Sequence, residues 1–189
     1  MNVRLISMTL GIAALLWTAR AEAVDLTVVT PKGHVTFSVG DEWGAGSPTK
    51  LPAAVFAFQI PDRADEGTPH STNVAVGIYD PNTVQGRDAL KTFGKRYGTS
   101  EPKSSHIGAW QVLEQSADQG GTGYVILDAR RDIVDVTATI RLAWPQLAAH
   151  SKDYDRKMRE TFRKLLDSVH GELGQYQRKD GDVVRRPTQ

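Results

Sequence analysis

The stretch from Ile133 to Trp144 constrains the fold most, because it alternates apolar and polar residues along its whole length. One side carries Val134, Val136, Ala138, Ile140, Leu142 and Trp144. The other side carries, besides Ile133, a stripe of four polar residues: Asp135, Thr137, Thr139 and Arg141. A period of two is the side-chain period of a β-strand. We expect this strand to belong to an antiparallel sheet that buries its apolar face and turns the polar face to water or to a partner.

Other segments predict further strands, giving a sheet of about six to seven strands. These segments are Val24–Thr30, Gly33–Val39, Ala53–Ile60, Val74–Ile78, Gly108–Gln115 and Gly123–Arg130. The glycine-rich stretch DQGGTGY (Asp118–Tyr124) contains no lysine and leads into a strand. It therefore indicates a hairpin turn and not a phosphate-binding loop, which combines glycines with a lysine and a following helix.

Two helices complete the predicted domain. The first covers Gln85–Tyr97, and the second covers Ser151–Val169, whose apolar stripe consists of Tyr154, Met158, Phe162, Leu165, Leu166 and Val169. We predict a single α+β domain over residues 24–171, in which a twisted antiparallel sheet carries these two main helices. Residues 172–189 have little apolar surface to bury and are expected to form a flexible polar tail.

Residues 1–23 have the layout of a secretory signal peptide. Arg4 makes the start positive, Leu5–Trp17 is mostly apolar, and Ala21-Glu22-Ala23 supplies the small-x-small cleavage pattern. An uncleaved membrane anchor is the alternative, but the apolar run is shorter than the roughly 18 to 20 residues that span a bilayer. We expect cleavage between Ala23 and Val24 and export to the periplasm. There is no cysteine for lipid attachment or redox chemistry.

The charge balance argues against nucleic-acid binding. Removing residues 1–23 takes two of the 23 basic and one of the 22 acidic residues, so 21 of each remain. Nucleic-acid-binding domains are usually strongly basic. The mature chain also contains no further apolar segment long enough to cross a membrane.

No motif in the chain predicts catalysis, a metal or a cofactor. The G-x-S-x-G nucleophile elbow is absent, and the five histidines form no H-E-x-x-H pair. The loop PDRADEG contains Asp62, Asp65 and Glu66, whose oxygens could collect a hard cation, although a solvated loop is the favoured interpretation. The sequence singles out no pair of acidic residues for glycoside cleavage. We therefore assign no catalytic residue.

Charged residues interrupt the alternation just before the long strand. Arg130, Arg131 and Asp132 are interpreted as a hairpin tip, and because no glycine or asparagine is present, we expect a loop longer than a type I′ turn. The polar stripe behind the tip is the stronger candidate for function. The candidate partner-binding residues are Arg130, Arg131, Asp132, Asp135, Thr137, Thr139 and Arg141.

The order of elements resembles the PsbP-like fold. The resemblance rests on FSVGDEW (Phe37–Trp43), STNVAVGI (Ser71–Ile78), and the closing pair TATIRLAW and FRKLLDSV, and it covers roughly Val35–Val169. It implies a twisted antiparallel sheet with packed helices. Members of this family are mostly non-catalytic accessory or binding proteins, including photosystem assembly factors, envelope lipoproteins and periplasmic immunity proteins. This chain departs from the lipoprotein branch because it lacks a cysteine.

These observations favour a non-enzymatic exported module that binds another protein, either a secreted toxin or an envelope component. An immunity-type protein and an envelope accessory protein fit the sequence equally well. A small-ligand carrier or a small periplasmic hydrolase is the rival class, which a pocket with convergent acids, or with a histidine beside a serine, would indicate.

Overall fold

The computed structural model describes residues 23–45, 54–62, 70–96, 98, 101–150, 153–175 and 183–185. The strands are β1 (Ala23–Val29), β2 (Gly33–Gly40), β3 (Gly44–Ala45), β4 (Ala54–Ile60), β5 (Thr72–Tyr79), β6 (Lys103–Ile107), β7 (Trp110–Gln119), β8 (Thr122–Ile133), β9 (Val136–Pro145), β10 (His170–Leu173) and β11 (Val183–Arg185). The helices are α1 (Val84–Leu90) and α2 (Tyr154–Ser168).

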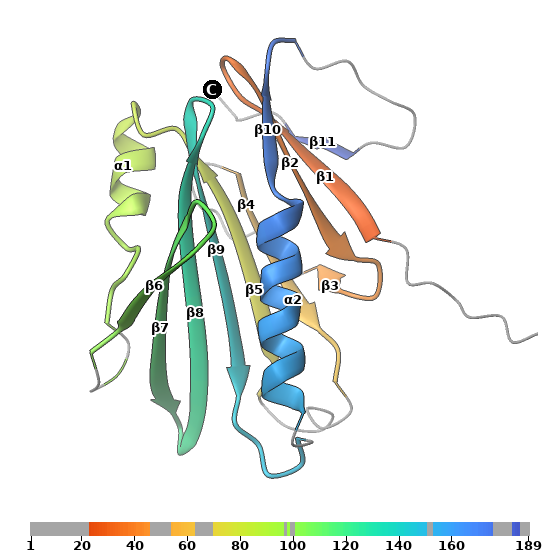
Figure 1. Cartoon of the computed structure of the whole chain (residues 1–189), viewed down its shortest axis with the longest axis vertical. Coiled ribbons are helices and arrows are strands. Elements are labelled where there is room, and N and C mark those ends of the chain that lie inside the picture. Colours follow the sequence, from red (N-terminus) through yellow and green to blue (C-terminus); the bar gives the residue numbers. More distant parts are fainter. Residues whose placement is uncertain are drawn as a thin grey trace, which may run out of the picture.

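The strands form two sheets (Figure 1). Seven antiparallel strands form the larger sheet in the order β3-β4-β5-β9-β8-β7-β6. The smaller sheet has the order β10-β2-β1-β11, in which β11 runs parallel to β1. The predicted fold class, α+β with an antiparallel sheet of six to seven strands and two helices, is confirmed. The separation of β1 and β2 into a second sheet was not predicted.

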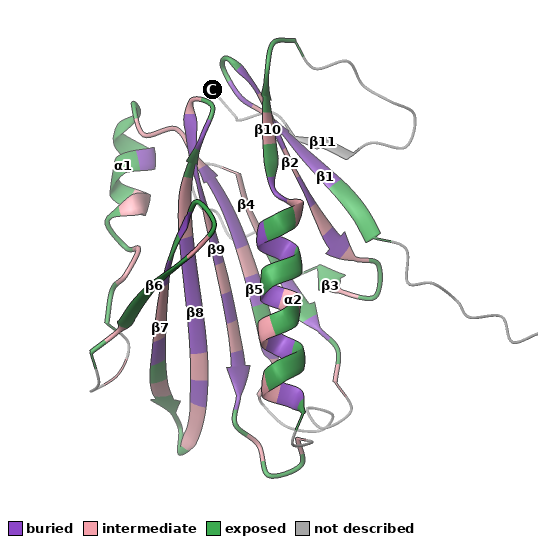
Figure 2. Ribbon diagram, in the orientation of Figure 1, coloured by how far each residue is buried: buried purple, intermediate pink, exposed green. Residues whose placement is uncertain are grey.

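The core lies between the two sheets and α2, which contacts both β2 and β9. The alternation of β9 is confirmed, since Ile140, Leu142 and Trp144 are almost completely buried. The apolar stripe of α2 is buried as well (Figure 2), and its helical spacing explains why this helix was predictable. Full burial of one such side chain contributes about 1.5–3 kcal/mol.

An ion pair fixes α2 to the larger sheet. The Arg159 guanidinium donates from Nη1 and Nη2 to the two Glu114 carboxylate oxygens at 2.8 Å each, and its Nε donates to Asp155. This hydrogen bonding lowers the pKa of Glu114 and raises that of Arg159, while burial opposes both shifts. The arginine carbon Cζ also lies 5.7 Å from the centroid of the Trp144 ring. The face of α2 that includes Arg159 is thus partly engaged within the fold.

Two element boundaries differ from prediction. The first helix ends at Leu90 and not at Tyr97, because turns follow it and Gly94 has a φ of +72°, which a continuing helix does not allow. Tyr97 itself lies outside the described residues. The predicted strand Gly108–Gln115 begins instead at Trp110, as β7, because Gly108 has a φ of +56° and lies in the turn that joins β7 to β6, a strand that was not predicted.

The predicted turn in DQGGTGY is confirmed. Gln119 pairs with Thr122, and the two residues between them, Gly120 and Gly121, have φ values of +63° and +85°. Positive φ at both central residues is the requirement of a type I′ hairpin turn.

The position of the β8–β9 turn was predicted wrongly. Arg130, Arg131 and Asp132 lie within β8, and the turn consists of Val134 and Asp135, flanked by the pair Ile133–Val136. It is a two-residue turn and not a longer loop, because Val134 adopts a φ of +56° although it is β-branched. Sequence rules assign such a conformation to glycine or asparagine, so a valine there is not foreseeable.

Contacts with the smaller sheet hold this turn in place. Asp135 accepts hydrogen bonds from the Thr30 hydroxyl at 2.8 Å and the Lys32 backbone N–H at 3.0 Å. A Cβ at Gly171 of β10 would lie 2.9 Å from Val134 Cγ2, so only glycine allows this close approach. Asp135 therefore joins the two sheets.

Part of the segment expected to be a flexible tail contains strands. Glu172 and Leu173 belong to β10, which pairs with β2, and Val183–Arg185 pairs with β1. Residues 176–182 and 186–189 of the predicted tail lie outside the described residues.

We predict that Val134→Asn raises the free energy of unfolding by about 1 kcal/mol, because asparagine tolerates a left-handed backbone that costs other residues about 1–2 kcal/mol. Urea denaturation measures the change. The matched control is Val24→Asn in β1, since Val24 is similarly exposed (39% against 42%) but lies in a paired strand. A loss of stability in Val134→Asn would show that the valine contact with Gly171 outweighs the backbone strain.

Candidate functional site

The candidate site lies on the outer face of the seven-stranded sheet, which is the face turned away from α2. Residues directly paired across neighbouring strands share a face. Leu113, Asp128, Arg141, Ala75 and Ala57 form one such row, which runs from β7 to β4 across the sheet.

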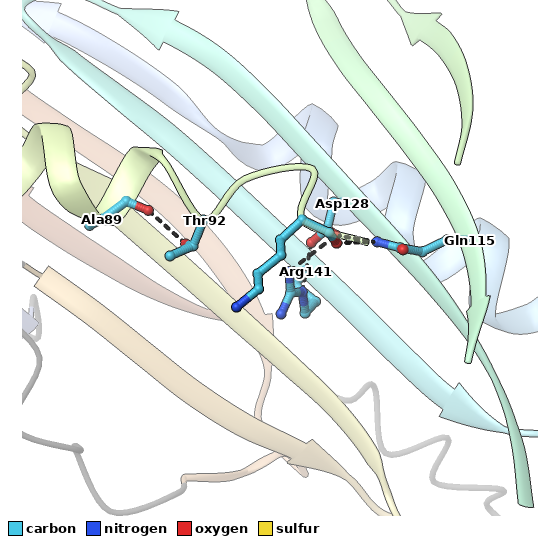
Figure 3. Close-up of polar contacts among 6 residues, drawn as sticks. Ala89, Thr92, Gln115, Asp128 and Arg141 are labelled. Atoms are coloured by element: carbon cyan, nitrogen blue, oxygen red, sulfur yellow. Dashed lines mark hydrogen bonds and ion pairs between the residues drawn. The ribbon is translucent and has the colours of Figure 1, made fainter. Parts of the chain in front are cut away.

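An ion pair between central strands anchors this face (Figure 3). Arg141 donates from Nε and Nη2 to the two carboxylate oxygens of Asp128, at 2.7 and 3.1 Å. The Asp128 side chain is 4% exposed, whereas that of Arg141 is 33% exposed. The Gln115 amide donates to the same carboxylate at 3.4 Å. The charge of the buried Asp128 carboxylate is thus balanced by Arg141. The Arg141 guanidinium is fixed in place and partly exposed to solvent.

A pocket of about 160 Å³ opens beside this pair. The lining side chains come from β4, β5, β8, β9 and the segment that includes α1 and the turns after it: Val55, Ala75, Gly77, Tyr79, Ala89, Thr92, Phe93, Asp128, Thr139, Ile140 and Arg141. Slightly more than half of the wall is apolar. The polar groups are concentrated at the Asp128–Arg141 pair and at three hydroxyls.

Gly77 shapes the floor of the pocket. A Cβ at this position would lie 2.4 Å from both the hydroxyl oxygen and Cε2 of Tyr79, so the aromatic ring covers the glycine. Burial raises the pKa of Tyr79, while a hydrogen bond with Thr139 and the positive charge of Arg141 lower it by smaller amounts. The phenol therefore stays neutral and hydrogen-bonded at neutral pH.

The roof of the pocket is fixed by close backbone contacts. Thr83 caps α1, accepting a hydrogen bond from the Gly86 N–H at 3.0 Å. A Cβ at Gly86 would lie 1.9 Å from the Asp80 carbonyl oxygen, so this helix sits directly on the end of β5. Beyond the helix, Gly94 approaches the Leu113 side chain, and the Gln115 amide donates to the Lys95 carbonyl. Gln115 thus links the roof to Asp128.

The structure separates the seven predicted partner-binding residues into two groups: five belong to the outer face of the larger sheet, and two make contacts elsewhere in the fold. Thr139 and Arg141 line the pocket. Arg130 and Asp132 belong to the same outer face, where Asp132 accepts a hydrogen bond from buried Thr137 at 2.6 Å. The prediction that these residues bind a partner stays a prediction.

The other two residues make contacts within the fold. Arg131 points to the inner face, where its Nη2 donates to the Val169 carbonyl at 2.9 Å and its Cζ lies 4.8 Å from the Trp110 ring centroid. Burial lowers its pKa. Asp135 joins the turn to the smaller sheet, as described above. Ala23 and Val24, at the predicted signal cleavage site, are the first residues of β1, and cleavage would leave Val24–Val29 in that strand.

Sequence reasoning missed the residues that make the pocket hollow. Ala75 and Gly77 were seen only as part of a strand, and Tyr79 and Asp128 were not singled out. Glycine inside a strand does carry a signal, because it often marks a place where a ligand or another group approaches closely. The pairing of Asp128 with Arg141 depends on register, which no short motif encodes.

The lining residues include one carboxylate, which is bound to Arg141, and no histidine. Within the described part of the chain, no group of three or more His, Cys, Asp or Glu residues could hold a metal ion. Most of the acidic loop 62–66 lies outside that part. No helix among the described residues is long and apolar enough to cross a membrane.

No protein-family model and no curated protein sequence matches the chain. Solved structures with related backbones include the Ran-binding protein Mog1p of Saccharomyces cerevisiae, at a TM-score of 0.49 and 11% identity over 80% of this chain and 96% of that one. LpqN of Mycobacterium tuberculosis, described as involved in cell envelope biogenesis, has a TM-score of 0.44 and 13% identity over 79% and 91%.

A third structure, from Bacteroides thetaiotaomicron, has a TM-score of 0.45 and 15% identity over 78% of this chain and 46% of that one. All three TM-scores are below 0.5, and these likenesses assign neither a family nor a function.

We predict that Arg141→Met lowers the free energy of unfolding by about 2 kcal/mol, because it leaves the buried Asp128 carboxylate without its counterion. The double variant Arg141→Met/Asp128→Leu is expected to recover to within about 1 kcal/mol of the native chain. Urea denaturation at neutral pH provides the measurement. The matched control, Arg156→Met, breaks a surface pair whose side chains are 70% and 73% exposed and should change little. Additive losses in the double variant would show that the two residues are not coupled.

Proposed function

We propose that this chain is an exported, non-enzymatic protein-binding module that receives its partner on the outer face of the seven-stranded sheet. The observation that carries the proposal is the pocket beside the Asp128–Arg141 pair, which is open to solvent in a face bordered by exposed polar residues. In the proposed complex, one partner side chain enters the pocket and the surrounding face supplies the rim.

The distribution of residues on this face matches the anatomy of a binding surface. Interfaces typically have a desolvated central anchor surrounded by a polar, water-accessible rim. Here the apolar pocket wall provides the centre. The rim consists of the exposed polar residues Gln59, Asn73, Gln111 and Asp132. Because the pocket is built on paired strands, it is preorganised and loses little conformational freedom on binding.

The proposed location is the periplasm, which rests on the signal-peptide pattern of residues 1–23. Two roles fit a binding module there. An immunity-type protein would cover the site of a secreted toxin, and an envelope accessory protein would hold another envelope component. A toxin gene beside this one, together with protection of cells from that toxin, would favour the first role.

A small-ligand carrier is the second candidate, since the same pocket could hold a free molecule. Its size argues for the protein-binding role, because binding sites for drug-sized ligands usually enclose about 300–1,000 Å³. The pocket, at about 160 Å³, matches a single side chain better than a whole ligand of that class.

We predict that Ala75→Leu weakens partner binding at least tenfold, because the added side chain fills the pocket between the sheet and its roof. The measurement is affinity capture of the mature protein from envelope extract, followed by titration of the captured partner. Ala57→Leu is the matched control, since Ala57 pairs directly with Ala75 on the same face but does not line the pocket. Equal binding by the native chain and both variants would contradict docking at this pocket.

A further inference from the structure

We infer that the pocket receives a tyrosine side chain from the partner. This inference rests on the proposed function and deepens it by naming the chemical group that is recognised. It is carried by the size of the pocket, by its two apolar walls and by the neutral, immobilised Asp128–Arg141 pair at its polar end.

The pocket has room for one six-membered ring. Its volume of about 160 Å³ is close to the roughly 150 Å³ of an apolar protein cavity that accommodates benzene. An indole ring or a lipid chain needs more room, whereas an alanine or serine side chain would leave most of the wall without a contact.

The shape of the wall favours a flat group. On one side the sheet contributes Val55, Ala75 and Gly77 to the floor, with the Tyr79 ring lying over the glycine. On the other side Ala89 and Phe93 from the roof face this floor. A planar ring can fill the slot between them and contact the Phe93 ring, with the favourable geometry that aromatic pairs adopt.

The charge of the pocket favours a neutral occupant. Arg141 is held by two hydrogen bonds to Asp128, and both residues line the pocket. Because the Asp128 carboxylate balances the guanidinium, a partner carboxylate would gain little net attraction from the pair, and an ammonium group would face the more exposed guanidinium. A fixed guanidinium plane, however, can stack on an aromatic ring.

The hydroxyls of Tyr79 and Thr139 favour a ring that carries a polar group. Both side chains line the pocket and share a hydrogen bond, and an entering ring removes water from the acceptor sites that this bond leaves unused. Burying polar groups without a hydrogen-bonding partner is costly. A phenol oxygen both donates and accepts hydrogen bonds, so tyrosine fits this end better than phenylalanine does.

The test is a nuclear magnetic resonance titration of the mature full-length protein with p-cresol, which is the tyrosine side chain itself. Toluene and 4-methylbenzoate are the comparison probes. We expect p-cresol to shift the amide signals of β5 and β9 around the pocket, with a dissociation constant on the order of 1 mM, as for a single fragment. Toluene and 4-methylbenzoate should each bind about tenfold more weakly.

Variants connect these shifts to the pocket. The p-cresol shifts should disappear in Ala75→Leu and persist in Ala57→Leu, and urea denaturation of both variants verifies that they are folded. The inference is overturned if toluene binds as tightly as p-cresol, if 4-methylbenzoate binds more tightly, or if p-cresol causes no shifts that depend on Ala75.

The capture experiment separates the two proposals. If Ala75→Leu abolishes partner capture but p-cresol does not bind the native chain, docking at the pocket stands and the tyrosine assignment fails. If p-cresol binds the pocket while Ala75→Leu leaves capture unchanged, the pocket serves a free phenol and not a partner side chain. That result overturns both the protein-docking proposal and this inference.

Discussion

The register between β8 and β9 is the constraint on which the rest of the structure depends. Because side chains alternate along a strand, a slip of one residue would turn every core residue of β9 to the outside. The two-residue turn at Val134 and Asp135 sets this register, and the pairing of Asp128 with Arg141 matches it. Slippage would also separate a buried carboxylate from its counterion, so the ion pair opposes the alternative pairings.

The same register creates both faces of the sheet. On the inner face it brings Ile140, Leu142 and Trp144 against α2 and the smaller sheet, and this packing supplies most of the burial. On the outer face it places Arg141 beside Ala75 and Asp128. The hollow there lies over small residues: the Tyr79 ring covers Gly77, whereas Tyr79, Phe93 and Arg141 border the room beside Ala75 without filling it. Stability and the candidate site therefore derive from opposite sides of one strand.

The main elements were predictable from the periodicity of their apolar residues, whereas features that break local residue preferences were not. The strand β9 and the helix α2 follow from alternation and helical spacing that reflect burial directly. The β8–β9 turn was predicted too early in the chain, because a valine with positive φ breaks the residue preferences of turns. Asp135 was placed in the polar stripe for the same reason, although it joins the two sheets.

The candidate site was predictable only in part. The polar stripe pointed to Thr139 and Arg141, since charged and polar residues alternate with core residues there. The partner of Arg141 lies on another strand, and the roof comes from α1, so their proximity is a property of the tertiary fold. Ala75 and Gly77 contribute through their small size, which the alternation of apolar and polar residues does not reveal.

The central claim, that a partner docks on the outer face of the seven-stranded sheet, is tested most directly by site-specific photocrosslinking in cells. A photoreactive amino acid at Asn73, an exposed position beside the pocket, is compared with one at Lys157, an exposed position on α2. The account predicts a crosslinked partner from position 73 and none from position 157. A crosslinked partner from position 157 alone would contradict it and place the binding surface on the helix.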